Sequence, residues 1–381
     1  MRKILSIRTG VVVSLAVGVL GACGSEDAPN AGSDDPFSIV ATTSVHADIV
    51  RSALGDAVPD VVTVESVMPA GADPHDFAPS AKQAEAMENA DLVVANGLDL
   101  ETGLLDIIAA VTDGGTPIFR FGDHVDVHTA TEHRDHDTDD DGDHADEDGD
   151  HAGDEHGDDA DGDHGDDDGD HAGDDHDADD GEHGDDADGE HGDDEHDDAD
   201  DHDHGEFDPH LWMDPLAIRS VVQALESALV DDGVDAASIS EPIAAYVERL
   251  TELDVEIENT LAPVPPERRV LVTNHDSLGY FADRYDLEVV GAVIPSLTTS
   301  ADASPAELDD LADVMRERSV NAIFAETTES DRLANALADQ VGEDVAVVEL
   351  FSGSLGPAGS GADTYVTMME TNSRLIADAL S

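Results

Sequence analysis

The segment Val270-Leu-Val-Thr-Asn-His-Asp-Ser-Leu-Gly-Tyr-Phe281 joins the features that decide how this chain folds. It begins with a short apolar and β-branched run, which is typical of a buried strand. The run leads into Asn274-His275, and a helical pattern follows from Gly279 to Tyr285. A strand that carries a histidine at its carboxyl end and then leads into a helix predicts an α/β fold, in which ligands bind at the carboxyl ends of the strands.

The same alternation of strand and helix patterns continues on both sides of this segment. Strands are predicted at 38–43, 61–67, 91–96, 117–121, 270–273, 289–294, 321–326 and 345–350. Helices are predicted from Ser44, which we expect to act as the cap, and at 80–89, 104–111, 215–230, 242–262, 279–285, 331–341 and 364–380. A further capped helix is predicted to open at Ser304. The chain is therefore predicted to form two lobes, each a mostly parallel sheet with flanking helices, joined by one long helix that opens at Pro242.

An acidic tract from Asp123 to Glu206 interrupts the first lobe. It contains 42 acidic residues, 15 of the 19 histidines and a single basic residue, Arg134. With almost no apolar side chains it cannot bury enough surface to fold, and a domain tolerates such a long loop because closure entropy grows slowly with length. We predict a disordered loop that gathers zinc through weak, multiple sites; a purely solvating segment is the alternative.

The expected organisation follows from these patterns. It comprises a signal peptide (1–22), a tether (23–36), an N-terminal lobe (37–122 with 207–240), the acidic loop (123–206), a connecting helix (241–264) and a C-terminal lobe (265–381).

The charge of the chain limits the classes of partner that it can bind. The formal net charge is -76, and Lys3 and Lys82 are the only lysines. Nucleic-acid binding needs basic patches, so this composition argues against it and favours cations as partners. The single cysteine excludes an internal disulfide.

That cysteine has an informative position. Arg2 and Lys3 precede an apolar run, which ends at Leu20-Gly-Ala-Cys23. A basic start, a short apolar stretch and small residues are typical of an export signal, and the ending resembles a bacterial lipobox in which Cys23 becomes lipidated. Acyl chains on Cys23 would hold the protein at a membrane surface, outside the cytoplasm. The alternative is a plain signal peptide with an incidental cysteine.

Three histidines outside the tract each lie in a turn-rich motif. They are His75 in Gly71-Ala-Asp-Pro-His, His210 in Asp208-Pro-His-Leu-Trp-Met-Asp-Pro215 and His275 in Asn274-His-Asp-Ser-Leu-Gly-Tyr-Phe281. Neutral imidazole is the commonest protein ligand for metals, and zinc favours it. A single histidine is usually a hydrogen-bonded structural residue, but three such motifs together predict a metal site.

These motifs resemble the zinc and manganese substrate-binding lipoproteins of bacterial ABC importers, the ZnuA and TroA type. The resemblance extends from Val40 to the C-terminus outside the tract, and further rests on Ala41-Thr-Thr-Ser, Phe324-Ala-Glu-Thr-Thr and Gly361-Ala-Asp-Thr-Tyr-Val-Thr-Met-Met369. It implies that His75, His210 and His275 bind the metal, the first two from the N-terminal lobe and the third from the C-terminal lobe. It also implies a membrane permease and an ATPase as partners and a lipid-anchored monomer. Because the long connecting helix would limit the motion of the lobes, we expect only a modest closure around the metal.

The fourth ligand is left open by the sequence. Many relatives supply a carboxylate shortly after the last strand, where this chain has Gly353. Water, Glu326 or a histidine of the tract could fill that position, and Glu326 could instead support a ligand from behind. Three imidazoles without a carboxylate favour Zn²⁺ over Mn²⁺, which prefers oxygen, although Mn²⁺ stays an alternative.

Three further residues have expected roles near the site. Asp208 and Asp276 could orient imidazoles, with ordinary turn or capping roles as the alternative. His46 lies where relatives often have a large apolar residue, and we expect it at the surface near the start of a helix, with an approach to the site as the alternative.

Two other classes of function use the same residues. Three histidines with an open position also describe a zinc hydrolase, but no convincing nucleophile accompanies them and we expect no enzyme. A metal buffer or adhesin would act mainly through the tract. The importer component is the function that the motifs favour.

Overall fold

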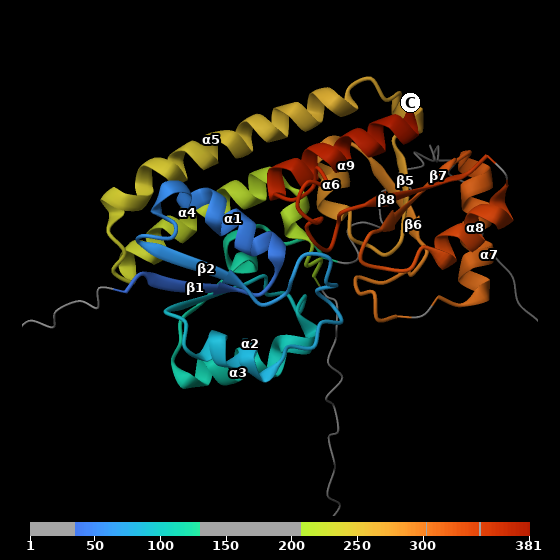
Figure 1. Cartoon of the computed structure of the whole chain (residues 1–381). Coiled ribbons are helices and arrows are strands. Elements are labelled where there is room, and N and C mark those ends of the chain that lie inside the picture. The colour runs from blue at the N-terminus through green and yellow to red at the C-terminus, as the bar shows by residue number, and fades with distance from the viewer. Residues whose placement is uncertain (1–34, 130–206, 302, 343) are drawn as a thin grey trace, which may run out of the picture.

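The structure is a computed structural model that describes residues 35–129, 207–301, 303–342 and 344–381 (Figure 1). The predicted signal peptide, Cys23, the tether up to residue 34, and residues 130–206 of the predicted loop lie outside these ranges. Among the described helices, none is both long and apolar enough to cross a membrane.

The N-terminal lobe is built on a parallel sheet of β1 (Phe37–Ala41), β2 (Val62–Ser66), β3 (Leu92–Ala95) and β4 (Ile118–Arg120) in the order β2-β1-β3-β4. Its two faces pack into different cores. Ile39 faces the core that includes α1 (Ser44–Leu54) and α4 (Pro215–Asp231), whereas Val40 faces α2 (Ala81–Glu88) and α3 (Leu105–Gly114). Burial on both faces explains why the inner strand β3, Leu92–Ala95, is apolar at every position.

The C-terminal lobe repeats this plan with β5 (Val270–Thr273), β6 (Glu288–Ala292), β7 (Ala322–Glu326) and β8 (Ala346–Leu350) in the parallel order β6-β5-β7-β8. Helices α7 (Pro305–Arg318) and α8 (Arg332–Val341) cover one face. Helices α6 (Gly279–Tyr285) and α9 (Tyr365–Leu380) pack in the core on the other. The predicted fold class is confirmed.

Helix α5 (Ala236–Leu261) runs along both lobes (Figure 1). It packs against α4 and α1 on the N-terminal side and against α9. The prediction that Pro242 opens this helix is wrong, because the helix starts at Ala236, where the Asp235 carboxylate accepts the backbone N–H of Ala237. Pro242 lies inside the helix. The Asp235 cap and buried side chains on both sides of Pro242, such as Ile239 and Ile243, favour continuing it.

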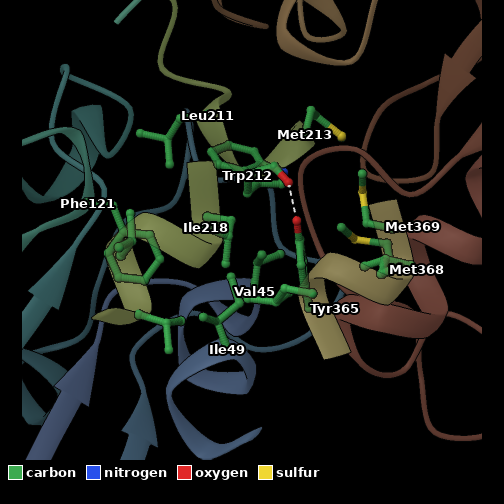
Figure 2. Packing of buried hydrophobic residues seen from close by; sticks show 14 of the residues in the cluster. Val45, Ile49, Phe121, Leu211, Trp212, Met213, Ile218, Tyr365, Met368 and Met369 are labelled. Carbon is green, nitrogen blue, oxygen red and sulfur yellow. Dashed lines mark hydrogen bonds between the residues drawn. The ribbon is translucent and has the colours of Figure 1, made fainter. Parts of the chain in front are cut away.

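The segment after His210 is the centre of the core between the lobes. Trp212 is fully buried beside Val45 and Ile218 of the N-terminal lobe and Tyr365 of α9 (Figure 2). The Tyr365 hydroxyl donates to the Trp212 carbonyl at 2.8 Å, and the Trp212 indole donates to the Ser352 carbonyl at 2.8 Å. Since both partners come from the C-terminal part of the chain, this packing fixes the lobes against each other close to His210.

The structure differs from the sequence predictions in two local details, the residue that caps α1 and the position at which the acidic loop begins. Thr43, and not Ser44, caps α1 by accepting the backbone N–H of His46. Residues 123–129 of the predicted loop belong to the folded lobe, in a 3₁₀ turn and in a bridge between Thr129 and Phe207. The described 3₁₀ helices are η1 (Gly55–Ala57), η2 (Thr102–Leu104), η3 (Phe121–His124), η5 (Leu211–Met213) and η6 (Pro266–Arg268).

Candidate metal centre

The three motif histidines meet between the lobes. His75 lies in the loop after β2, His210 immediately before η5, and His275 in the turn between β5 and α6. All three are buried, at 4%, 1% and 1% exposure. The loop of His75 is held by the Asp73 carboxylate, which accepts the His75 backbone N–H at 2.9 Å. Two lobes and three separate loops therefore deliver imidazoles to one buried point.

The imidazole nitrogens converge at distances that suit a bound ion. The Nε2 atom of His210 lies 3.2 Å from that of His75 and 3.1 Å from that of His275. One ligand atom from each residue fits within a group no wider than 4.8 Å. Nitrogens bound to zinc at about 2.0–2.1 Å in a tetrahedron lie about 3.3 Å apart. The observed spacing is close to that value.

Two carboxylates lie behind this triad of histidines. Asp208 Oδ1 lies 2.8 Å from His210 Nδ1, and Glu326 Oε1 lies 2.8 Å from His275 Nδ1. A carboxylate at Nδ1 favours the proton there and leaves Nε2 with its lone pair. The bare nitrogens then point at one another, an arrangement that needs a shared proton or a cation between them. Of the two aspartates weighed from sequence, Asp208 orients an imidazole directly.

The charges of the site follow from burial and from these carboxylates. Burial, reinforced by the neighbouring imidazoles, holds the pKa of His75 well below its ordinary value. Burial also opposes charge on His275, but the Glu326 carboxylate outweighs it and raises the pKa of His275. For Glu326, burial is likewise outweighed by the facing His275, which lowers the pKa of Glu326 to about 2. A proton on His275 therefore competes with a metal.

Glu326 and Gly353 lie side by side, which bears on the fourth ligand. A Cβ atom added at Gly353 would lie 3.8 Å from Glu326 Oε2 and 3.2 Å from Pro74 Cδ. Glu326 Oε1 faces His275 Nδ1 and accepts the Ser277 hydroxyl at 2.8 Å. The Glu326 carboxylate thus supports His275 from behind. Asp276, the other aspartate considered, acts on His275 through its charge, and its backbone N–H donates to Ser296.

His46 does not lie at the surface, so that expectation is wrong. It is fully buried, with its ring edge-on to Phe121 at 4.5 Å and to Trp212 at 5.9 Å. Its Nδ1 lies 2.9 Å from the Thr43 hydroxyl and its Nε2 lies 3.2 Å from Asn96 Oδ1. Burial lowers the pKa of His46 to about 3, so the ring stays neutral. It is a core residue beside the site, outside the triad.

A buried polar network beneath His210 was not predicted from the sequence. The Asn96 amide donates to the Pro209 carbonyl at 2.9 Å, and Asn96 N–H donates to the Glu101 carboxylate at 2.7 Å. Glu101 also accepts the Thr42 hydroxyl at 2.7 Å. Thr42 and Asn96 follow the adjacent strands β1 and β3, where the strand order reverses. Their position after strand ends is the one signal that could have suggested this network.

Contacts between the lobes reach the loop of His75. The Thr299 hydroxyl donates to Asp73 Oδ2 at 2.6 Å, and Gly71 N–H donates to the Ser354 hydroxyl at 2.9 Å. A cavity of about 210 Å³ lies beside His75 and is lined by both lobes, including Leu98 of the N-terminal lobe and Leu297 of the C-terminal lobe. The triad is thus closed by hydrogen bonds on one side and borders a small cavity on another.

Comparison with known proteins agrees with this architecture. The family model described as "ZnuA: Zinc-uptake complex component A periplasmic" matches residues 39–379. The zinc-binding protein TroA of Treponema pallidum is 26% identical over 380 residues, which cover 97% of this chain and 96% of that protein. The manganese-binding lipoprotein MntA of Halalkalibacterium halodurans is 23% identical over 382 residues, covering 100% of both. The solved structure of the periplasmic zinc-binding protein TroA from Treponema pallidum superposes with a TM-score of 0.64 at 25% identity, covering 91% of this chain and 99% of that one.

Proposed function

This chain belongs to the ZnuA family of zinc-uptake complex components, and on that premise we propose that it captures Zn²⁺ between its lobes and passes it to the membrane permease of a metal ABC importer. Substrate binding for such an importer is the function of the family. Its relatives include proteins named for zinc and for manganese. The cargo is therefore a divalent metal of this class, and Zn²⁺ is the ion that we propose.

The convergence of three Nε2 atoms carries this proposal. We propose His75, His210 and His275 as the ligands, with Asp208 and Glu326 as the groups that orient His210 and His275. Three nitrogen donors suit Zn²⁺ better than Mn²⁺, which prefers oxygen. The glycine at position 353 supports the same choice, since it supplies no carboxylate. We assign Glu326 a supporting role because its Oε1 atom is engaged with His275 and Ser277.

The remaining features describe how such a protein would work in a cell. We propose that Cys23 carries a lipid anchor, that the chain acts as a monomer on the outer side of the membrane, and that it works with a permease and an ATPase. The relatives are binding proteins, so we propose no catalytic step. The acidic tract would serve as an accessory that gathers metal.

Competitive zinc titration of the full chain tests this proposal. With a chelator that strips weak sites, we expect one tight site in the natural protein. His75→Ala should abolish this tight site, because only two of the three imidazole ligands remain. His124→Ala is the matched control, since His124 lies in the same lobe but stacks on Phe119 outside the triad. A tight site that survives in His75→Ala would contradict the proposed ligands.

A further inference from the structure

One tyrosine hydroxyl joins the segments that carry two of the three histidines. Tyr280 lies on α6, five residues after His275, and its side chain is buried. Its hydroxyl donates to the Asp208 carbonyl at 3.2 Å and accepts the backbone N–H of His128 at 3.1 Å. A residue of the C-terminal lobe therefore holds two separate segments of the N-terminal lobe.

Those two segments form the root of the acidic tract, which we define as residues 128–129 and 207–208. They are paired by an antiparallel bridge between Thr129 and Phe207, and Asp208 N–H donates to the His128 carbonyl at 2.9 Å. These are the last described residues before position 130 and the first described residues after position 206. Tyr280 thus binds the folded lobe at the place where the tract leaves and returns.

Helix α6 holds the root through more than one contact. The His128 ring stacks on the Tyr280 ring, with centroids 4.1 Å apart and planes 13° from parallel. His128 Nδ1 lies 3.3 Å from the Asp283 carboxylate, and Asp283 is three residues after Tyr280 on the same face of the helix. Three contacts from one helix to a single residue make this an organised junction between the lobes.

The root leads directly to the metal centre. Asp208, whose carbonyl accepts the Tyr280 hydroxyl, also uses its carboxylate to hold His210. The Oδ1 atom accepts the His210 backbone N–H at 2.9 Å and lies 2.8 Å from His210 Nδ1. A shift of Asp208 would therefore turn the imidazole of His210 away from His275. Groups behind a metal ligand set its orientation and its basicity.

We propose that Tyr280 is a positioning residue for metal binding, which acts through the Asp208 backbone to keep His210 aimed at the other two histidines. The proposal rests on the proposed function of the triad. It also makes the root of the acidic tract part of the metal centre. By linkage, loosening the root weakens metal binding, and metal binding tightens the root by the same factor.

Tyr280→Phe in the full chain tests this directly, because it removes the hydroxyl and keeps the stacked ring. Loss of a buried hydrogen bond is expected to weaken binding at the tight site, and to speed Zn²⁺ release to a chelator, by about three- to tenfold. The visible absorption of bound Co²⁺, which reports coordination geometry, should also change. Tyr285→Phe is the matched control: Tyr285 is buried on the same helix, but its hydroxyl donates to Asp254. It should leave both readouts as in the natural protein.

The outcomes separate this inference from the proposed function. Natural release rates and a natural Co²⁺ spectrum in Tyr280→Phe would overturn the positioning role, while loss of the tight site in His75→Ala would still support the triad. A tight site that survives in His75→Ala would instead defeat the proposed function. Amide hydrogen exchange of the natural chain tests the inference without any variant, so it still applies if Tyr280→Phe does not fold. Zinc should slow exchange of the His128 N–H, and unchanged exchange would overturn the inference.

Discussion

Glu326 stands behind His275, with its Oε1 atom 2.8 Å from the imidazole Nδ1, at the opposite side of the ring from the Nε2 that faces His210. The carboxylate comes from the end of β7, and the histidine follows β5, the strand beside it. The two neighbouring strands thus supply a ligand candidate and its support.

Glu326→Gln should weaken zinc binding by about 10- to 100-fold, which is the usual effect of losing a carboxylate behind a ligating histidine. The reason is that the amide orients the ring less firmly and makes Nε2 less basic. Chelator competition measures the effect. Glu349→Gln, an exposed glutamate on the adjacent strand β8, is the control and should bind as the natural chain does. Equal zinc affinities of the two variants would show that Glu326 does not support metal binding.

His46→Gln should make the free energy of unfolding fall less steeply as the pH is lowered. His46 has its pKa lowered to about 3 from 6.5, so below pH 6.5 the unfolded chain takes up a proton that the folded chain does not. This contribution to stability is complete above pH 6.5 and is lost as pH falls toward about 3. Glutamine has no such titration. Urea unfolding of metal-free protein from pH 7 to pH 4 should show the difference between the two chains shrinking by about 1.4 kcal/mol per pH unit below pH 6.5. Parallel curves would show that His46 does not stay neutral in the fold.

Gly353→Asp should raise affinity for Mn²⁺ by about tenfold, or about 1.4 kcal/mol. A carboxylate there would lie beside Glu326 Oε2, so it would repel that group in the metal-free protein and supply an oxygen donor to an ion. Isothermal titration with Mn²⁺ and Zn²⁺ measures the change. Gly353→Asn has the same shape without the charge, and a matching gain in that variant would show that charge is not the cause.

Thr299→Val should release metal about three to ten times faster, because it removes the hydroxyl that donates to Asp73 across the lobes at 2.6 Å. Asp73 also holds His75 N–H, so the loop of His75 loses a brace. Stopped-flow chelation records the rate. Thr298→Val is the control, because the Thr298 hydroxyl accepts a bond within its own loop from Ser300. An unchanged rate in Thr299→Val would mean that this contact does not hold the metal in.

The fold was largely predictable because strands inside its two sheets, such as β3, β5 and β7, are buried along their whole length. An apolar run such as Val270–Thr273 can be interpreted as a buried strand when helices with clear caps flank it. The alternation of such strands with helices indicates parallel sheets. The error at Pro242 has a physical cause. A local rule places proline at a helix start, but the Asp235 cap and buried positions on both sides of the proline determined the actual start.

The site was predictable only in part. The meeting of His75, His210 and His275 follows from their motifs, although their role as ligands stays a prediction. The buried place of His46 could not be predicted, because the rings around it, Phe121 and Trp212, come from distant segments. The hydrogen bond between Thr299 and Asp73 joins residues 226 positions apart, and nothing local in the sequence indicates it.

Anomalous diffraction at the zinc absorption edge, from crystals of the full chain with one equivalent of Zn²⁺, tests the central claim most directly. The account predicts one strong peak among the Nε2 atoms of His75, His210 and His275, at about 2.0–2.1 Å from each. A strong peak elsewhere, with the triad empty, would contradict it.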